Sequence, residues 1–266
     1  MRLNVLVTGH KGFIGSHVYS NLIRNGFTVY GLDRGDVLPE NVKFDVIVHL
    51  AARSQVIESV QLPYEYFQDN LALTVKFLDL ARKHDATFVF ASSAAIAKLS
   101  NPYALTKKHS MDWVDLYRKL YGIRAFNLIL YNIYGEGNRK GAVYVFTKAA
   151  LTGETATVYG DGTHVRDYFY VGDVVRVIRS IISGELPPGD YECGTGRGVS
   201  VIELIQIIER VTKRKINYVH KDYPVDEVEY SVAKNPVLKN PLPLEEGIKR
   251  VVEFIKSSEN IREIQS

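Results

Sequence analysis

What this 266-residue chain lacks excludes several classes of protein. Its only cysteine is Cys193, so no intrachain disulfide can form, which is typical of a reducing, cytoplasmic location. No apolar run reaches the roughly 18 residues that a membrane-spanning helix needs, so we expect no membrane partner. The net charge of +3 is too small for a dedicated nucleic-acid surface. No cluster of His, Cys or Asp has metal-ligand spacing, so no metal site is predicted.

What the chain does contain is an alternation of apolar runs and helical stretches. The runs suit strands buried on both faces and cover residues 3–8, 28–33, 46–50, 87–91 and 124–131. Helical patterns cover 16–25, 64–84 and 101–121. This alternation predicts an α/β fold with a Rossmann-like, doubly wound parallel sheet. The more mixed remainder, with helices over 199–213 and 241–256 and a strand over 216–219, predicts a small C-terminal lobe.

One connection is too short for the usual plan of such a sheet. Only residues 34–44 separate Asp33 from Asp45. Fully extended they span ~36 Å, enough to cross beneath the sheet but not to form a further strand and helix as well. We therefore predict that the usual third strand is missing and that the second strand lies near an edge.

The first strand leads into a glycine-rich turn, Gly9-x-x-Gly12-x-x-Gly15, and then into a helix. Glycines allow a tight turn and a close approach of backbone N–H groups to a pyrophosphate, which the positive end of the helix also favours. The second strand ends in Asp33, an acid suited to the hydroxyls of an adenosine ribose. Together these features predict a dinucleotide site rather than a turn that only packs helix on strand.

A serine, a tyrosine and a lysine form the candidate catalytic group. Ser93 follows the strand over 87–91, and Tyr103 and Lys107 lie on one face of the next helix. A nearby cation lowers the pKa of a phenol from about 10 toward neutrality. The phenolate can then take a hydroxyl proton while a hydride leaves for a nicotinamide. The alternative is that Tyr103 only packs at the helix start, and the lone His49 is interpreted as a packing residue.

These motifs resemble the extended short-chain dehydrogenase/reductases, and among them the NAD-dependent nucleotide-sugar epimerases and dehydratases. The resemblance also rests on His49-Leu50-Ala51-Ala52, on Asn70, on Tyr131-Asn132-Ile133-Tyr134-Gly135 and on the segment 160–173 with Arg166. It implies NAD as cofactor, with residues 1–155 (and 165–183 returning to them) binding it and 156–266 mainly forming a substrate lobe. It also implies a homodimer through helices 64–84 and 101–121.

The resemblance also implies the roles of individual residues. Ser93, Tyr103 and Lys107 would be catalytic. The cofactor would contact Gly9, Gly12, Phe13, Ile14, Gly15, Asp33, Arg34, Leu50, Ala51, Ala52, Asn70, Tyr103, Lys107 and Tyr131. A nucleotide-diphosphate sugar would contact Ser93, Tyr103, Asn132, Val143, Tyr159, Arg166 and Tyr230. Asp33 would repel a 2′-phosphate and so favour NAD over NADP, although Arg34 beside it keeps NADP open.

Departures from the family narrow the reaction. Ala94-Ala95 stands where the dehydratases carry an Asp-Glu pair and where 3,5-epimerase/reductases carry a cysteine. What remains is epimerisation at C4 through a 4-keto sugar, with a UDP-hexose favoured. The alternatives are a nucleotide-sugar 4-ketoreductase using NAD(P)H and a non-catalytic NAD-binding protein. In the family the third strand supplies an adenine contact, and here Asp36-Val37 could replace it. Tyr223-Pro224-Val225-Asp226 lacks an arginine that is usual in the family.

Overall fold

The computed structural model of the chain describes residues 2–223 and 228–258. The chain divides into two compact units. Unit 1 comprises Met1–Leu130 and Val174–Cys193, and unit 2 comprises Tyr131–Asp173 and Gly194–Ser266. The NAD-binding part predicted for residues 1–155 with 165–183 and the substrate lobe predicted for 156–266 stay predictions, and the compact units have their own bounds at Leu130, Val174 and Cys193.

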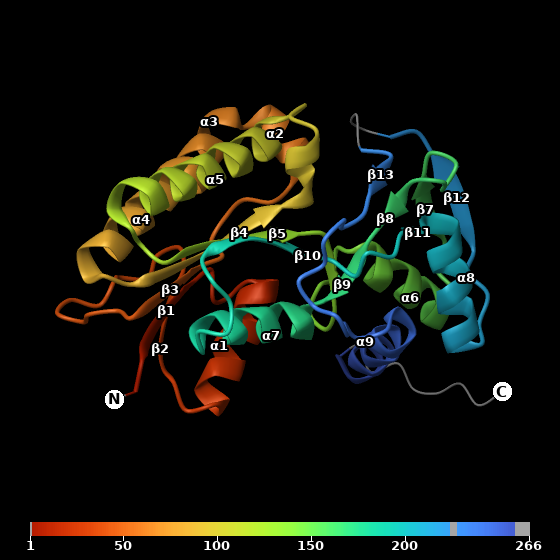
Figure 1. Cartoon of the computed structure of the whole chain (residues 1–266). Coiled ribbons are helices and arrows are strands. Elements are labelled where there is room, and N and C mark those ends of the chain that lie inside the picture. Colours follow the sequence, from red (N-terminus) through yellow and green to blue (C-terminus); the bar gives the residue numbers. More distant parts are fainter. Residues whose placement is uncertain (1, 224–227, 259–266) are drawn as a thin grey trace. The chain divides into compact units, whose positions relative to one another are not determined.

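Unit 1 is built on a six-stranded sheet, and all of its neighbouring strands are parallel. The strand order is β10-β5-β4-β3-β1-β2. The strands are β1 (Asn4–Thr8), β2 (Thr28–Leu32), β3 (Val46–His49), β4 (Thr87–Ser93), β5 (Ala125–Leu130) and β10 (Gly189–Cys193). Figure 1 shows α2 to α5 on one face of this sheet and α1 and α7 on the other. The predicted doubly wound parallel sheet is confirmed.

The second strand lies at the edge of this sheet, as predicted. β2 pairs with β1 alone among the described strands, and residues 33–45 contain no strand. The short link is fastened by its last residues. The Phe44 ring packs edge-on against Tyr30 at 5.6 Å, and the Asp45 carboxylate accepts a hydrogen bond of 2.7 Å from the N–H of Asn4. The link therefore closes directly onto β3 without an intervening strand.

The helices of unit 1 set the positions of the candidate catalytic residues. They are α1 (Phe13–Arg24), α2 (Val56–Gln61), α3 (Pro63–Tyr66), α4 (Leu73–His84), α5 (Pro102–Tyr121) and α7 (Val171–Ile182), which begins in unit 2. A π-helical turn, η1 (Phe67–Ala72), joins α3 to α4, and a 3-10 helix, η2 (Ala94–Ala97), follows β4. The start of α5 is fixed by Pro102 and by the Asn101 side chain, which accepts a hydrogen bond of 2.9 Å from the N–H of Ala104.

The described residues of unit 2 form three small sheets and three helices, and these helices pack against one another. The sheets are β11-β8-β13, β12-β7 and β6-β9. Their strands are β6 (Asn132–Tyr134), β7 (Ala156–Tyr159), β8 (Val165–Arg166), β9 (Tyr168–Tyr170), β11 (Val199–Ser200), β12 (Tyr218–Lys221) and β13 (Tyr230–Ser231). The helices are α6 (Ala142–Thr152), α8 (Val201–Thr212) and α9 (Leu244–Ser258). No helix in the described part of the chain combines the length and apolar character needed to cross a membrane.

Candidate active site

The glycine-rich turn brings the ends of two strands together. Gly9 has a φ of 71°, and a Cβ atom on it would lie 2.8 Å from the backbone nitrogen of Ala51. A Cβ on Gly15 would lie 2.0 Å from the carbonyl oxygen of Gly9. Gly12 is the N-cap of α1, and because it has no side chain it leaves the first N–H groups of the helix for an anion. The turn therefore fits a pyrophosphate.

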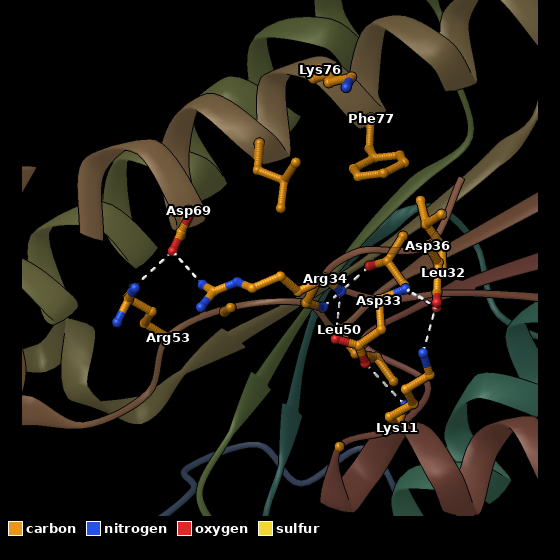
Figure 2. Close-up of a pocket in the computed structure, with 16 residues that line it drawn as sticks. Lys11, Leu32, Asp33, Arg34, Asp36, Leu50, Arg53, Asp69, Lys76 and Phe77 are labelled. Atoms are coloured by element: carbon orange, nitrogen blue, oxygen red, sulfur yellow. Dashed lines mark hydrogen bonds and ion pairs between the residues drawn. The ribbon is translucent and has the colours of Figure 1, made fainter. Parts of the chain in front are cut away.

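A cavity of about 670 Å³ adjoins this turn in unit 1 (Figure 2). The predicted cofactor residues that line it are Gly9, Gly12, Asp33, Arg34, Leu50, Ala51 and Ala52. Seven other predicted cofactor residues do not belong to the lining of this cavity as the described residues form it. They are Phe13, Ile14, Gly15, Asn70, Tyr103, Lys107 and Tyr131. The lining also includes residues that the sequence analysis missed, namely Lys11, Arg53, Asp69, Leu73, Lys76 and Phe77.

Asp33 is held firmly at the wall of this cavity. Its carboxylate accepts hydrogen bonds from the backbone N–H groups of Arg34 at 2.8 Å and Lys11 at 3.1 Å. Its own N–H donates to Asp36 at 2.9 Å, and the Lys11 ammonium lies 2.7 Å from the same Asp36 side chain. Lys11 holds the pKa of the Asp36 carboxyl below its ordinary value. Asp36 lines the cavity, whereas its neighbour Val37 is 85% exposed, so of this pair Asp36 is the candidate for an adenine contact.

Asp69 joins two cations that come from different strand ends. One of its carboxylate oxygens lies 2.8 Å from Arg34 Nη2 and 2.7 Å from Arg53 Nε. Arg34 follows β2, Arg53 lies in the loop after β3, and Asp69 lies in η1. The sequence could have indicated Arg53 and Asp69, because each lies directly beside a predicted cofactor residue. Arg53 follows Leu50-Ala51-Ala52, and Asp69 precedes Asn70.

The structure brings the candidate catalytic residues Ser93 and Tyr103 together. Their side chains are hydrogen-bonded, and the Ser93 Oγ also accepts a hydrogen bond of 3.2 Å from the N–H of Ala95. Burial raises the pKa of Tyr103, while its hydrogen bond with Ser93 acts in the opposite direction. The expectation that a cation lowers this phenol pKa is wrong here, because burial outweighs every other effect on Tyr103.

Lys107 is buried beside this pair on α5. Its ammonium donates a hydrogen bond of 2.7 Å to the carbonyl oxygen of Ala91 and lies 4.9 Å from the centre of the Phe90 ring. Burial lowers the pKa of Lys107 to about 7. Lys107 is therefore directed at the end of β4, and it is poised to gain or lose its proton near neutral pH.

A buried polar network links the cavity wall to the first turn of α5. Asn70 in η1 accepts a hydrogen bond of 2.8 Å from the N–H of Arg53. Its side-chain nitrogen donates to Thr106 Oγ1 at 3.3 Å, and Thr106 in turn donates to the Tyr103 carbonyl oxygen at 2.9 Å. The π-helical turn places Asn70 in this position, and such turns are frequent at functional sites. Asn70 thus positions Arg53 and the Tyr103 turn.

His49 belongs to the same buried polar network, so it forms hydrogen bonds in addition to packing. Its ring nitrogens lie 2.8 Å from Thr8 Oγ1 and 3.2 Å from Thr74 Oγ1. Thr74 donates its own proton to the Asn70 carbonyl oxygen, so His49 Nε2 is the donor and Nδ1 the acceptor. Burial lowers the pKa of His49 to about 3, so the ring is neutral.

Unit 2 holds the predicted diphosphate ligands around one buried carboxylate, Asp167, which is 0% exposed. The Asp167 side chain accepts hydrogen bonds of 2.8 to 3.1 Å from the N–H groups of Thr195, Gly196 and Ala233. Its carbonyl oxygen accepts a hydrogen bond of 2.9 Å from the N–H of Asn132. Asp167 therefore ties together the segments that carry Asn132, Arg166 and Tyr230.

The other predicted substrate residues of unit 2 differ in exposure. Arg166 in β8 pairs with Ser231 in β13, and its guanidinium donates to the Val165 carbonyl oxygen at 3.0 Å. Tyr159 and Tyr230 are 46% and 65% exposed, whereas Val143 is buried in the core at 1%. The motif 223–226 lies outside the described residues beyond Tyr223. In the described ranges, no group of three or more His, Cys, Asp or Glu side chains could hold a metal ion.

Comparison with known families identifies the fold. The model of the NAD dependent epimerase/dehydratase family matches residues 5–194. The chain belongs to this family. It is 30% identical to a putative UDP-glucose 4-epimerase of Methanocaldococcus jannaschii, over 96% of this chain and 99% of that protein. It is also 30% identical to a UDP-glucuronate 4-epimerase of Thermodesulfobacterium geofontis, over 98% of each.

Solved structures of similar proteins agree with this family. A UDP-glucose 4-epimerase from Thermotoga maritima, solved with UDP-glucose, has a TM-score of 0.84 and 27% identity, covering 97% of this chain and 100% of that one. The Thermus thermophilus UDP-glucose 4-epimerase in complex with NAD has a TM-score of 0.83 and 26% identity, covering 96% and 100%. The predicted family, fold, NAD cofactor and epimerase-type enzyme are confirmed.

Proposed function

We propose that this enzyme epimerises a UDP-hexose at C4 through a transient 4-keto sugar. The observation that carries the proposal is the hydrogen-bonded pair of Ser93 and Tyr103, followed by a 3-10 helix that begins with Ala94-Ala95. This helix supplies no carboxylate to eliminate water and no thiol to act as a second acid. The similarity to UDP-glucose and UDP-glucuronate 4-epimerases over almost the whole chain supports the same reaction.

The residues of unit 1 would perform the proton transfer. When bound, NAD supplies a reversible hydride acceptor. Tyr103 would take the proton of the sugar's C4 hydroxyl, and Ser93 would donate a hydrogen bond to the same oxygen. Burial opposes ionisation of Tyr103, so a protonated Lys107 would offset part of that cost when the phenol gives up its proton. With a pKa of about 7, Lys107 is partly protonated near neutrality. No further acid or base is needed, because the same tyrosine returns the proton.

The residues of unit 2 would hold the substrate by its nucleotide. Arg166 matches a diphosphate with its planar guanidinium, and Asn132 adds a neutral donor. Tyr159 and Tyr230 expose large aromatic surfaces that could pack against the base or the sugar. Binding energy from the nucleotide would keep the keto sugar attached while it turns its other face to the hydride.

Product analysis tests the proposal. The purified protein is incubated with UDP-glucose, UDP-galactose, their N-acetyl forms and UDP-glucuronate, and the sugars are separated and identified by NMR. We expect interconversion of one C4 pair with no net change in the absorbance of reduced nicotinamide. Stoichiometric oxidation of NADH or NADPH without epimer would instead establish the 4-ketoreductase. Binding of NAD without turnover of any of these sugars would establish a non-catalytic protein.

We also propose that the enzyme is a homodimer and cytoplasmic. One face of α5 exposes Leu105, Trp113, Leu116 and Leu120, at spacings that place them on one side of the helix. The neighbouring α2 to η1 segment exposes Val60, Tyr64 and Phe67. An apolar surface shared by adjacent helices suits the same surface of a second copy.

A further inference from the structure

We propose that Asp69 is a specificity-determining residue that favours NAD over NADP by holding Arg34 away from the position of a 2′-phosphate. This inference rests on the cofactor occupying the 670 Å³ cavity of unit 1. Asp69 also lines this cavity, but it lies in η1, apart in the chain from the glycine turn and from Asp33, and neither of these features requires an acid there. Asp69 therefore adds a second determinant to the acidic residue at the end of β2.

The contacts of Asp69 define how Arg34 is held. Figure 2 shows the Arg34 side chain extending away from Asp33 and across to Asp69, where Arg53 meets the same carboxylate. Arg53 is fixed in turn by Glu58, 3.1 Å from its Nη1. Asp69 is therefore kept in place by a partly buried guanidinium, and it presents its charge to the more exposed Arg34.

The charge of the cavity alone would not exclude NADP. Its lining contains four cations and three acids, namely Lys11, Arg34, Arg53, Lys76, Asp33, Asp36 and Asp69. Arg34 is the cation next to Asp33 along the chain, and a guanidinium free to turn toward the ribose would match the oxygens of a 2′-phosphate in a bidentate manner. Discrimination against the extra phosphate must therefore depend on where the cations are held.

The ion pair between Asp69 and Arg34 predicts what removal of the Asp69 charge would do. Removing the charge of Asp69 releases Arg34 and also removes a negative charge from the cavity, and both changes favour NADP. The Arg34 side chain is 75% exposed and that of Asp69 is 38% exposed, so solvent screens the pair. The expected effect is therefore several-fold in affinity rather than a complete reversal, because Asp33 still repels the phosphate.

Calorimetric titration of the full chain with NAD and with NADP tests this without turnover. In Asp69→Asn we expect the Kd for NADP to fall by about fivefold, while the Kd for NAD stays within about twofold. The double variant Asp69→Asn/Arg34→Ala should lose this gain, because it lacks the released guanidinium. Asp79→Asn is the matched control, since Asp79 pairs with Arg82 and Lys83 on α4 and does not line the cavity.

The outcomes separate this inference from the proposed function. An unchanged NADP affinity in folded Asp69→Asn, or a gain that persists in the double variant, overturns the inference. If Asp69→Asn does not fold, Arg34→Ala alone decides. An unchanged ratio of the two Kd values supports the inference that Asp69 holds Arg34 away from the phosphate. A marked loss of NADP affinity contradicts it. If the wild type binds neither dinucleotide, the proposed function fails with it.

Discussion

The two units hold the carboxylates of their candidate sites in opposite ways. In unit 1, Asp36 and Asp69 stand at the cavity with side chains 30% and 38% exposed, and each is paired with the side chain of a lysine or arginine. In unit 2, Asp167 is completely buried, and its hydrogen bonds come mainly from backbone N–H groups. The first arrangement consists of exposed ion pairs that solvent screens, and the second consists of bonds that the fold itself supplies.

This difference indicates which carboxylates can be substituted without loss of the fold. Exposed ion pairs contribute about 0–1 kcal/mol, so their partners can be exchanged with little effect on stability. Buried N–H groups that lose their acceptor cost about 1–3 kcal/mol each. Substitutions at the ion-paired carboxylates of unit 1 should therefore cost little stability, whereas loss of the Asp167 carboxylate should destabilise the fold of unit 2. The predictions below test this contrast from the largest effect to the smallest.

Tyr103→Phe is expected to have the largest effect, and to confine it to turnover. Loss of the phenol removes the proton acceptor, so epimerisation should fall by about 10²- to 10⁴-fold. Binding of UDP should remain unchanged, because the proposed diphosphate residues belong to unit 2. The measurement is the initial rate of product formation alongside calorimetry with UDP. Tyr144→Phe is the control, since Tyr144 and Lys148 have the same four-residue spacing on α6; full activity in Tyr103→Phe would contradict the mechanism.

Asp167→Ala should break unit 2 instead. It leaves the N–H groups of Thr195, Gly196 and Ala233 without their acceptor, so the free energy of unfolding should fall by at least about 3 kcal/mol. UDP binding should be lost, whereas NAD binding to unit 1 should survive. Urea unfolding followed by circular dichroism measures the change. The exposed Asp161 of the same segment provides the control Asp161→Ala, with a change within about 1 kcal/mol. Equal losses in the two variants would refute the special role of Asp167.

The features that were predicted correctly depend on residues close together in the sequence. Buried strands produce unbroken apolar runs, and the short link 34–44 placed β2 at the edge. Asn101-Pro102 fixes where α5 begins, so Tyr103 lies at its start. The strand β10 was missed because only Cys193 of its five residues is buried, which leaves no apolar pattern.

The missed parts of the site depend on contacts between distant segments. Arg34 and Asp69 are 35 residues apart, and Asp167 and Ala233 are 66 apart. No periodicity or turn signal relates such pairs, and the π-helical turn that places Asn70 and Asp69 has no pattern of its own in the sequence. The pKa of Tyr103 was predicted in the wrong direction for a similar reason, since spacing places Lys107 on the same helix face but does not reveal burial.

The charge of Lys107, the one buried ammonium described in unit 1, should make the free energy of unfolding depend on pH. Its pKa of about 7 lies below its ordinary 10.5, so the folded chain binds fewer protons than the unfolded chain between these values. Stability should therefore rise with pH across this window, by up to about 1.4 kcal/mol per pH unit from this group. Unfolding measured without nucleotide from pH 6 to about pH 10 should show a shallower slope in Lys107→Met than in the wild type. Parallel curves would show that Lys107 is not titrating in this range.

The last prediction concerns the mass of the protein in solution. The apolar face of α5, which belongs to unit 1, is the proposed dimer interface. Light scattering should give twice the chain's mass of 30.0 kDa for the wild type. Leu116→Glu places a charge at the centre of this face, so the mass should fall to that of one chain, because a desolvated carboxylate is costly at an interface. Val219→Glu is the control, since Val219 is also exposed, at 47%, but lies on β12 of unit 2. Dissociation by the β12 variant, or a monomeric wild type, would reject α5 as the interface.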